Sequence, residues 1–205
     1  MTLINNLIKE GWLKTPRIIR AFQEINRADF LTEDIKNSAE LNSALPIGYG
    51  QTISQPLVVA FMLELLEPKE GDKILDIGFG SGWTSALLAA IVGQGGRVIA
   101  IEIISELKEF GEKNISKYNF IKKGIVECFY ADGTKGYQKE APFDKILCSA
   151  AAQKKIPQAL RDQLKIGGRI VSSVDQSIWL FIKKSEKEFK EIEYPGFVFV
   201  PLVKK

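Results

Sequence analysis

A glycine-rich turn, DIGFGSGW at residues 76–83, joins a short apolar segment to an apolar helix pattern. The segment before it, KILDIG (73–78), has the length and composition of a buried strand, and SALLAAIVG (85–93) has those of a helix. The glycines follow a G-x-G-x-G spacing, whereas Trp83 stands where the dinucleotide fingerprint G-x-G-x-x-G has its third glycine. This unit predicts an α/β fold built on parallel strands, with a ligand other than a dinucleotide at the turn.

Strand and helix patterns alternate along the rest of the chain. They predict a doubly wound, mostly parallel seven-stranded sheet of the Rossmann-like kind. The expected strands are 73–78, 97–103, 125–132, 143–150, 167–174, 178–184 and 196–203. No helix separates the last two, so we expect an antiparallel C-terminal pair. Helical patterns at 3–31 and 57–66 flank a polar, irregular stretch. We therefore expect a single domain over residues 1–205, with a helical N-terminal cap at 1–50 and a Rossmann-like catalytic core at 51–205.

Composition excludes several classes of partner. The net charge is only +3, and the lysines are scattered among glutamates, so a nucleic-acid partner is not expected. No apolar run is long enough to span a membrane. The chain has no histidine, so Cys128 and Cys148 cannot complete a common zinc site, and no metal is expected. Both cysteines lie in apolar runs and are interpreted as buried, reduced thiols, which fits a cytoplasmic protein.

Three acidic residues occupy informative places on the expected strands. Glu102 ends the second strand about twenty residues after the glycine turn, where this kind of fold places an acid that accepts the ribose hydroxyls. Asp132 ends the third strand, where it either accepts from an adenine amino group or forms an Asp-Gly turn. Asp76 lies in a buried strand and needs a partner, either a ligand ammonium or a backbone amide. With the glycine turn, these acids predict a site for S-adenosylmethionine.

The segment GYGQTISQP (48–56) contains no histidine, acid or lysine. Its Ser54 precedes Gln55, Pro56 and a clear helix pattern, which is typical of a helix N-cap. A serine at a helix N-terminus could equally donate a hydrogen bond to a bound carboxylate. The residues alone leave both roles open.

Taken together, these segments resemble those of the protein-L-isoaspartate O-methyltransferases. The resemblance runs from about Ala21 to the C-terminus, and LPIGYGQTISQP and FVPLV carry it most specifically. ILDIGFGSGW, IEIISEL and ADGTKGY are similar to that family's cofactor, ribose and adenine segments, with Ala131 in place of a glycine. The sequence departs from the family pattern at Gln153, Lys154 and 33–42, residues that would shape the substrate cleft.

The resemblance implies methyl transfer from S-adenosyl-L-methionine to the α-carboxyl of L-isoaspartyl residues in damaged proteins and peptides, which begins their repair. It implies Ser54 as the catalytic residue. The cofactor-binding residues expected from the pattern and the resemblance together are Gln51, Thr52, Ile53, Ser54, Asp76, Gly78, Gly80, Ser81, Gly82, Glu102, Ile103, Asp132 and Gly133.

Three other functions share part of this sequence pattern. An aspartyl carboxyl methyltransferase acting on a peptide natural product would share the core, but we expect such an enzyme to extend well beyond FVPLV. A non-catalytic S-adenosylmethionine-binding module should carry a damaged 48–56 segment, and here the segment is intact. A nicotinamide oxidoreductase is opposed by Trp83. Isoaspartyl-containing proteins and peptides are the expected partners, and we expect a monomer.

Overall fold

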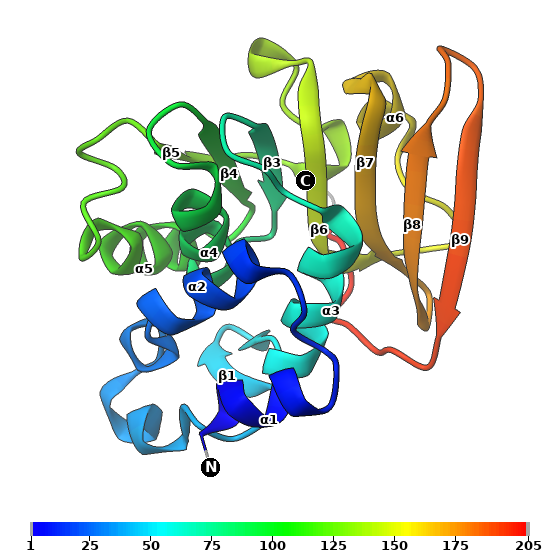
Figure 1. Cartoon of the computed structure of the whole chain (residues 1–205). Helices are drawn as coiled ribbons and strands as arrows, with labels where there is room; N and C mark the ends of the chain where they lie inside the picture. Colours follow the sequence, from blue (N-terminus) through cyan, green and yellow to red (C-terminus); the bar gives the residue numbers. More distant parts are fainter. Residues whose placement is uncertain (1, 204–205) are drawn as a thin grey trace.

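Seven strands form one mixed sheet in the computed structural model, which describes residues 2–203 (Figure 1). The strands are β3 (Lys73–Ile77), β4 (Arg97–Glu102), β5 (Val126–Tyr130), β6 (Phe143–Ala152), β7 (Leu164–Val174), β8 (Ser177–Lys183) and β9 (Phe189–Pro195). Their order across the sheet is β5-β4-β3-β6-β7-β8-β9. The first five in that order pair in parallel, while β8 and β9 are antiparallel to their neighbours. The predicted seven-stranded α/β sheet is confirmed.

The order of the strands reverses between β3 and β6. From β3 the chain moves outward to β4 and β5, then crosses back to β6 on the other side of β3. In open parallel sheets, ligands bind at the carboxyl ends of the strands beside such a switch point. The loops after β3, β4 and β6 therefore share one edge of the sheet.

Helices cover both faces of the sheet. Those on one face are α3 (Pro56–Leu66), α4 (Trp83–Val92) and α5 (Ser105–Ser116), and α2 (Pro16–Glu24) packs outside α4. The other face carries α6 (Gln158–Asp162) and the 3-10 turns η3 (Gly133–Lys135) and η4 (Gln138–Glu140). Successive β3 residues point to opposite faces, so Ile74 belongs to the first core and Leu75 and Ile77 to the second. Both faces are buried, which explains why apolar residues of β3 point to both faces and do not alternate with exposed polar ones.

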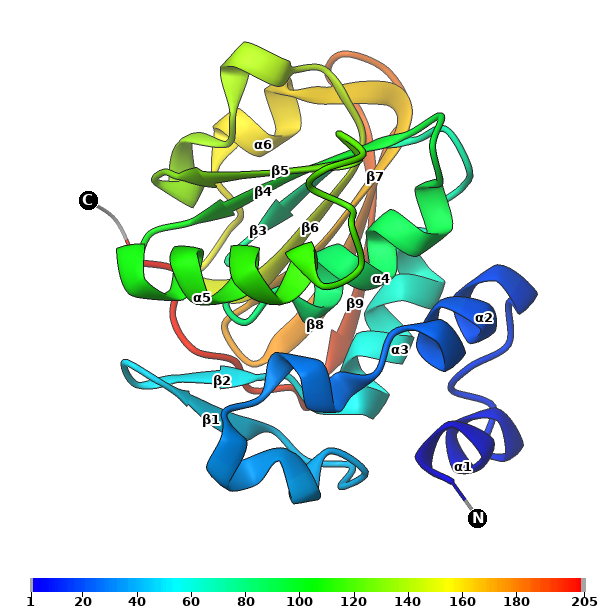
Figure 2. The same ribbon diagram turned by 90° about the vertical axis from the view of Figure 1, so that its left-hand side faces the viewer.

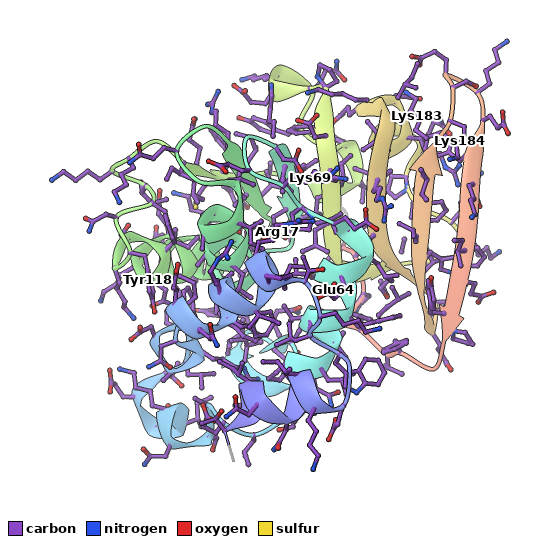
Figure 3. The ribbon with its side chains drawn as sticks, in the orientation of Figure 1. Arg17, Glu64, Lys69, Tyr118, Lys183 and Lys184 are labelled. Carbon is purple, nitrogen blue, oxygen red and sulfur yellow. The ribbon has the colours of Figure 1, made fainter. Side chains whose placement is uncertain are left out.

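The N-terminal segment, where helical patterns were expected over 3–31, consists of several short helices. It forms α1 (Leu3–Lys9), α2, η1 (Arg27–Phe30) and η2 (Glu33–Ser38). Gly11 adopts a left-handed φ of 76° and ends α1. Glu64 of α3 (Figure 3) fixes the chain just before α2: it accepts from the backbone amides of Lys14 and Thr15 at 2.8 Å each and from the Thr15 hydroxyl at 2.6 Å.

A two-stranded hairpin follows these helices, where a loop was expected. Strands β1 (Leu45–Gly48) and β2 (Gln51–Ile53) pair antiparallel, and Tyr49 and Gly50 form the turn. The hairpin spans the expected border between residues 50 and 51. Figure 2 shows the C-terminal segment, in red, running between the sheet and this hairpin.

The predicted strand at 196–203 is wrong. The last strand, β9, ends at Pro195, and the residues after it form only an isolated bridge between Ala151 and Pro201. Gly196 has a φ of 96°, which ends the strand. As the edge strand beside β8, β9 is charged and half-exposed, with Ile192 and Tyr194 packing against one core and Phe189 against the other.

Two expectations from composition can be compared with the structure. Cys128 and Cys148 are free thiols; Cys148 is fully buried, as predicted, whereas Cys128 is only partly buried. Within residues 2–203, no helix is long and apolar enough to cross a membrane.

Candidate active site

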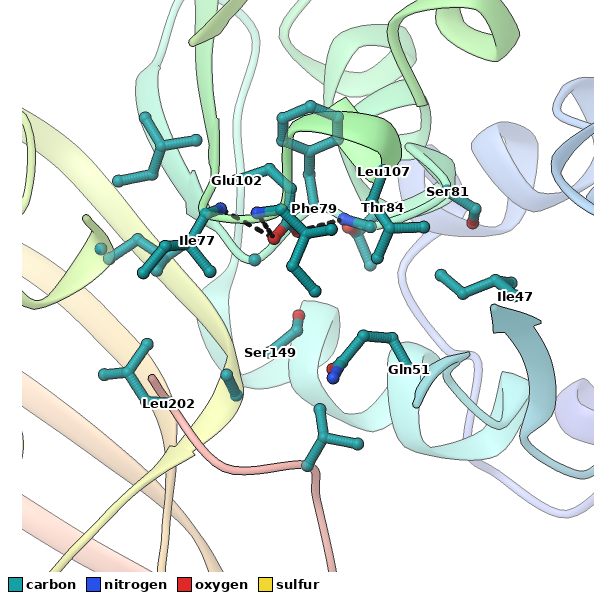
Figure 4. A pocket seen from close by; sticks show the side chains of 18 of the residues that line it. Ile47, Gln51, Ile77, Phe79, Ser81, Thr84, Glu102, Leu107, Ser149 and Leu202 are labelled. Carbon is teal, nitrogen blue, oxygen red and sulfur yellow. Dashed lines mark hydrogen bonds between the residues drawn. The ribbon is translucent and has the colours of Figure 1, made fainter. Parts of the chain in front are cut away.

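A pocket opens at the carboxyl edge of the sheet, beside the switch point between β3 and β6. Its walls come from the loop after β3, the end of β4, the end of β6, the β1–β2 hairpin and the C-terminal segment. The residues from these walls are Gly78–Ser81, Glu102–Ile104, Ser149, Ala150, Ile47, Gln51–Ser54 and Val200–Val203. Gln51 and Ser149 reach into the pocket from the side opposite Glu102 (Figure 4).

The glycine turn brings backbone to the pocket wall because side chains would not fit there. Gly80 has a φ of 51°, and a Cβ on it would lie 3.1 Å from Ile47 of the hairpin. Gly82 has a φ of 91°, and a Cβ there would lie 2.8 Å from the carbonyl oxygen of Gly111 in α5. Helix α4 begins immediately after Gly82, so its N-terminus is directed at this part of the pocket.

Glu102 is held at the pocket wall by three backbone amides (Figure 4). Its Oε1 accepts from Ile103 at 2.8 Å and from Ile104 at 3.0 Å, and its Oε2 accepts from Gly80 at 3.0 Å. The side chain is buried, with 6% of its surface exposed. A carboxylate has about four acceptor sites, so three amides leave capacity for a hydroxyl donor from a ligand. Glu102 therefore couples the glycine turn to the end of β4 and presents a fixed acceptor to the pocket.

Asp132 lies beside the pocket and caps a turn. Its Oδ1 accepts from the Thr134 amide at 2.9 Å and from the Thr134 hydroxyl at 2.7 Å, which begins η3. Its neighbours Ala131 and Gly133 line the pocket, and Asp132 itself does not. The structure thus provides the Asp-Gly turn that the sequence left open, and the adenine contact stays a prediction.

Asp76 was expected to bind a ligand ammonium or a backbone amide, but its partners in the structure are two hydroxyl groups. The period of β3 points it toward α4, where its Oδ2 accepts from the hydroxyls of Thr84 at 2.8 Å and Ser85 at 2.6 Å. It does not line the pocket and is fully buried. Burial raises the pKa of Asp76 to about 6, against the two hydroxyl bonds that lower it, and the charge of Glu102 raises it further.

Ser54 lines the pocket at the end of the hairpin, and it is not a helix N-cap. The N-cap of α3 is Gln55. The free amide of Leu57 in the first turn of α3 is satisfied instead by Oδ1 of Asn42, at 3.0 Å. Within residues 2–203, no side chain or backbone group hydrogen-bonds to the Ser54 hydroxyl. The hydroxyl is therefore available to a ligand in the pocket.

Most of the predicted site residues meet in this pocket. Those that line it are Gln51, Thr52, Ile53, Ser54, Gly78, Gly80, Ser81, Glu102, Ile103 and Gly133. Asp76, Gly82 and Asp132 do not line it, because each is turned to a neighbouring helix or turn.

The sequence interpretation missed several lining residues, among them Phe79, Trp83, Ser149 and Val200. The position of Ser149 near the carboxyl end of a strand was a usable signal. For the wall contributed by the C-terminal segment, the available signal was the motif FVPLV, which contains Val200–Val203.

The chemistry of these residues fits a nucleoside with a short charged tail. Glu102 offers a buried acceptor for a ribose hydroxyl, and the loop around Gly80 admits a ligand where a Cβ would crowd Ile47. Within residues 2–203, no group of three histidine, cysteine or acidic side chains could hold a metal ion. The fold and the pocket define an S-adenosylmethionine-dependent methyltransferase.

Comparisons with known proteins identify the family. The family model for protein-L-isoaspartate(D-aspartate) O-methyltransferase matches residues 1–205. The protein-L-isoaspartate O-methyltransferase of Methanopyrus kandleri is 40% identical over 98% of this chain and 89% of its own length. A second such enzyme, from Archaeoglobus fulgidus, is 43% identical over 91% of this chain and 84% of its own. The chain belongs to the protein-L-isoaspartate O-methyltransferase family.

Solved structures agree with the fold. A Plasmodium falciparum protein in complex with S-adenosyl-L-homocysteine superposes with a TM-score of 0.88 at 21% identity, covering 99% of this chain and 97% of that one. A solved protein-L-isoaspartate O-methyltransferase gives a TM-score of 0.87 at 26% identity, covering 97% of this chain and 64% of that one. Both confirm the arrangement of sheet and helices.

Proposed function

We propose that this protein transfers a methyl group to the free α-carboxylate of L-isoaspartyl residues in damaged proteins and peptides. The observation that carries the proposal is the pairing, in one pocket, of a buried ribose acceptor, Glu102, with an unpartnered hydroxyl, Ser54. Glu102 suits the ribose of the methyl donor, and the Ser54 hydroxyl suits a carboxylate that accepts the methyl group. S-adenosylmethionine supplies an activated methyl group on its sulfonium when bound.

The pocket needs no general base for this reaction. A carboxylic acid has a pKa near ~4, so the attacking carboxylate is already ionised at neutral pH. The chain must hold one oxygen in line with the methyl group and remove its water. Apolar side chains of Ile47, Ile53 and Leu202 line the pocket and exclude water. A strong cation beside the carboxylate would lower its nucleophilicity, and a hydroxyl avoids that cost.

Within this proposal, Ser54 donates a hydrogen bond to the α-carboxylate. Ser54→Ala should leave cofactor affinity nearly unchanged and lower methyl transfer by about 10- to 100-fold, the value of one hydrogen bond to a charged group. Loss of an N-cap costs about 0.5–2 kcal/mol of stability. Because the N-cap of α3 is Gln55, the Ser54→Ala variant should lose less than that. Calorimetry, melting and turnover on one preparation separate the roles. A destabilised but fully active variant would assign Ser54 to structure alone.

The substrate is tested with one peptide prepared in isoaspartyl and normal aspartyl forms. Methanol released after incubation with S-adenosylmethionine reports the methyl ester. An isoaspartyl link places its free carboxylate one methylene closer to the chain, so a rigid pocket should reject the aspartyl form, which would leave buried donors unpaired. Equal methylation of the two peptides would instead indicate a general aspartyl methyltransferase.

The remaining site assignments are part of the same proposal. Gln51, Thr52, Ile53, Gly78, Gly80, Ser81, Ile103 and Gly133 would contact the cofactor directly, and Asp76, Gly82 and Asp132 would shape the loops that hold it. We further propose that residues 1–205 form one methyltransferase domain that acts in the cytoplasm as a monomer. Sedimentation equilibrium tests the monomer, since a dimer would double the 22.9 kDa mass.

A further inference from the structure

Arg27 is a buried cation whose donors converge on the backbone around the proposed catalytic serine. It begins η1, and 5% of its surface is exposed. Its Nη1 donates to the carbonyl oxygens of Ala39 at 3.1 Å and Leu41 at 2.9 Å. Its Nη2 donates to the carbonyl oxygens of Ser43 at 2.8 Å and Ser54 at 3.2 Å. One guanidinium thus joins the stretch before the hairpin to the residue that follows it.

The charge of Arg27 is balanced in an uncommon way. It forms no ion pair with any residue that the structure describes, and its Nε has no hydrogen-bond partner there. The guanidinium carbon lies 5.4 Å from the ring centroid of Trp83, a residue that lines the pocket. Burial lowers the pKa of Arg27 to about 10, partly offset by the charge of Glu40. Burying a cation without an ion pair costs stability, which points to a functional reason for its position.

The bonds of Arg27 interlock with a second set around Asn42. Leu41 and Ser43, whose carbonyls Arg27 binds, flank this asparagine. The Asn42 side chain accepts from the Leu57 amide, and its carbonyl oxygen accepts from Nε2 of Gln55, each at 3.0 Å. Ser54 is therefore held on one side by Arg27 and on the other through its neighbour Gln55. Its backbone is fixed while its hydroxyl is left without a partner.

We propose that Arg27 is a positioning residue for methyl transfer: it touches neither reactant, and it holds the Ser54 backbone so that the hydroxyl meets the carboxylate. The inference rests on the role of Ser54 in the proposed function. A planar fork with several donors suits this task, because it can bind carbonyls from separate segments in one plane. Lysine has a single nitrogen and cannot span the same four carbonyls.

The first measurement is hydrogen exchange on Arg27→Lys and Arg27→Gln, each compared with the unchanged chain. Amide exchange in peptides covering 51–57 should rise, while exchange in β3 stays unchanged. Arg17→Lys is the matched control, because Arg17 (Figure 3) also binds backbone, donating to the carbonyl oxygen of Pro68 at 2.6 Å, but lines no part of the pocket. Unchanged exchange over 51–57 in both Arg27 variants would overturn the inference.

The second measurement is a double-mutant cycle of Arg27→Lys with Ser54→Ala, using the isoaspartyl peptide and rates normalised to sites that bind S-adenosyl-L-homocysteine. Arg27→Lys alone should lower kcat/KM by about 10- to 100-fold, as a misplacement of about 1 Å can. The affinity for S-adenosyl-L-homocysteine should stay within about twofold. The double variant should lose no more than the worse single one, because both changes remove the same contact.

The outcomes separate this inference from the proposed function. Losses that multiply in the double variant, or an equal loss in Arg17→Lys, would overturn the positioning role. If the unchanged chain transferred no methyl group to the isoaspartyl peptide, the proposed function would fail. The exchange measurement would then decide by itself whether Arg27 holds the Ser54 segment.

Discussion

Replacing Glu102 by glutamine tests whether one carboxylate both builds the pocket and binds the ribose. The two side chains have nearly the same shape, so packing is preserved. The amide oxygen can accept from the Ile103 and Ile104 amides, and the NH2 group must then face the Gly80 amide, which needs an acceptor at 3.0 Å. One buried donor is left unpaired, at a cost of about 1–3 kcal/mol. For a domain of this size, that lowers Tm by roughly 2–12 °C.

The same substitution should weaken cofactor binding. Glutamine loses the charge that strengthens a hydrogen bond from a ribose hydroxyl, worth about 1.5–3 kcal/mol. At about 1.4 kcal/mol per factor of ten, the Kd for S-adenosyl-L-homocysteine should rise by roughly 10- to 150-fold. Calorimetry gives the affinity, and thermal unfolding of the ligand-free protein gives the stability.

Glu127→Gln is the matched control. Glu127 lies on the neighbouring strand β5, pairs with Arg97, and has 41% of its side chain exposed. Exposed ion pairs contribute about 0–1 kcal/mol, so this change should leave cofactor affinity unaltered. If Glu102→Gln kept both the Tm and the Kd of the unchanged chain, the amide bonds would not stabilise the turn and Glu102 would not contact the ribose.

Two further predictions follow from buried positions near the pocket. Gly111→Ala should lower the free energy of unfolding by about 1–3 kcal/mol, because the added Cβ would lie 2.6 Å from the Phe79 ring and overlap the Gly80 carbonyl oxygen. In an uncrowded helix the same change would stabilise by about 1 kcal/mol. Urea unfolding measures the effect, and a stabilised variant would contradict the close approach of α5 to the glycine turn. Asp76 has a pKa of about 6, raised from its ordinary 3.8, so the folded protein holds this proton more tightly than the unfolded chain. Stability should therefore fall as pH rises from about 4 to about 6, by about 3 kcal/mol from this group, and Asp76→Asn should remove that part of the fall. Equal pH slopes in the two proteins, measured by unfolding across this range, would show that Asp76 is not the group responsible.

The sequence by itself determined the central part of the fold. The mostly apolar sequence of β3 and the strand–helix alternation after it have local causes, because a strand buried on both faces lacks the alternation of apolar and exposed polar residues. The glycine turn and the position of Glu102 also have local causes. A tight turn packed against neighbouring chain admits only glycine, and in this kind of fold the second strand ends about twenty residues after that turn. These features position the cofactor half of the pocket.

Only the tertiary structure decided the other half. The wall at 200–203 exists because Ala151 pairs with Pro201 across fifty residues of chain, and β9 is a strand because β8 lies beside it. Ser54 is not needed as a cap of α3, because the side chain of Asn42, from a separate segment, accepts from the Leu57 amide in the first turn of that helix. Such contacts depend on which surfaces meet after folding, and no periodicity within either segment encodes them.

Arg27 shows the same limit most clearly. An arginine between Asn26 and Ala28 has nothing in its neighbourhood to distinguish it from a solvated surface residue. Its burial, its four carbonyl partners and its approach to Trp83 arise only when η1, the segment 39–43, the hairpin and α4 come together. Local sequence specifies backbone turns and strand faces because their causes lie within a few residues. The partners of a long, charged side chain are set by what folding brings within its reach.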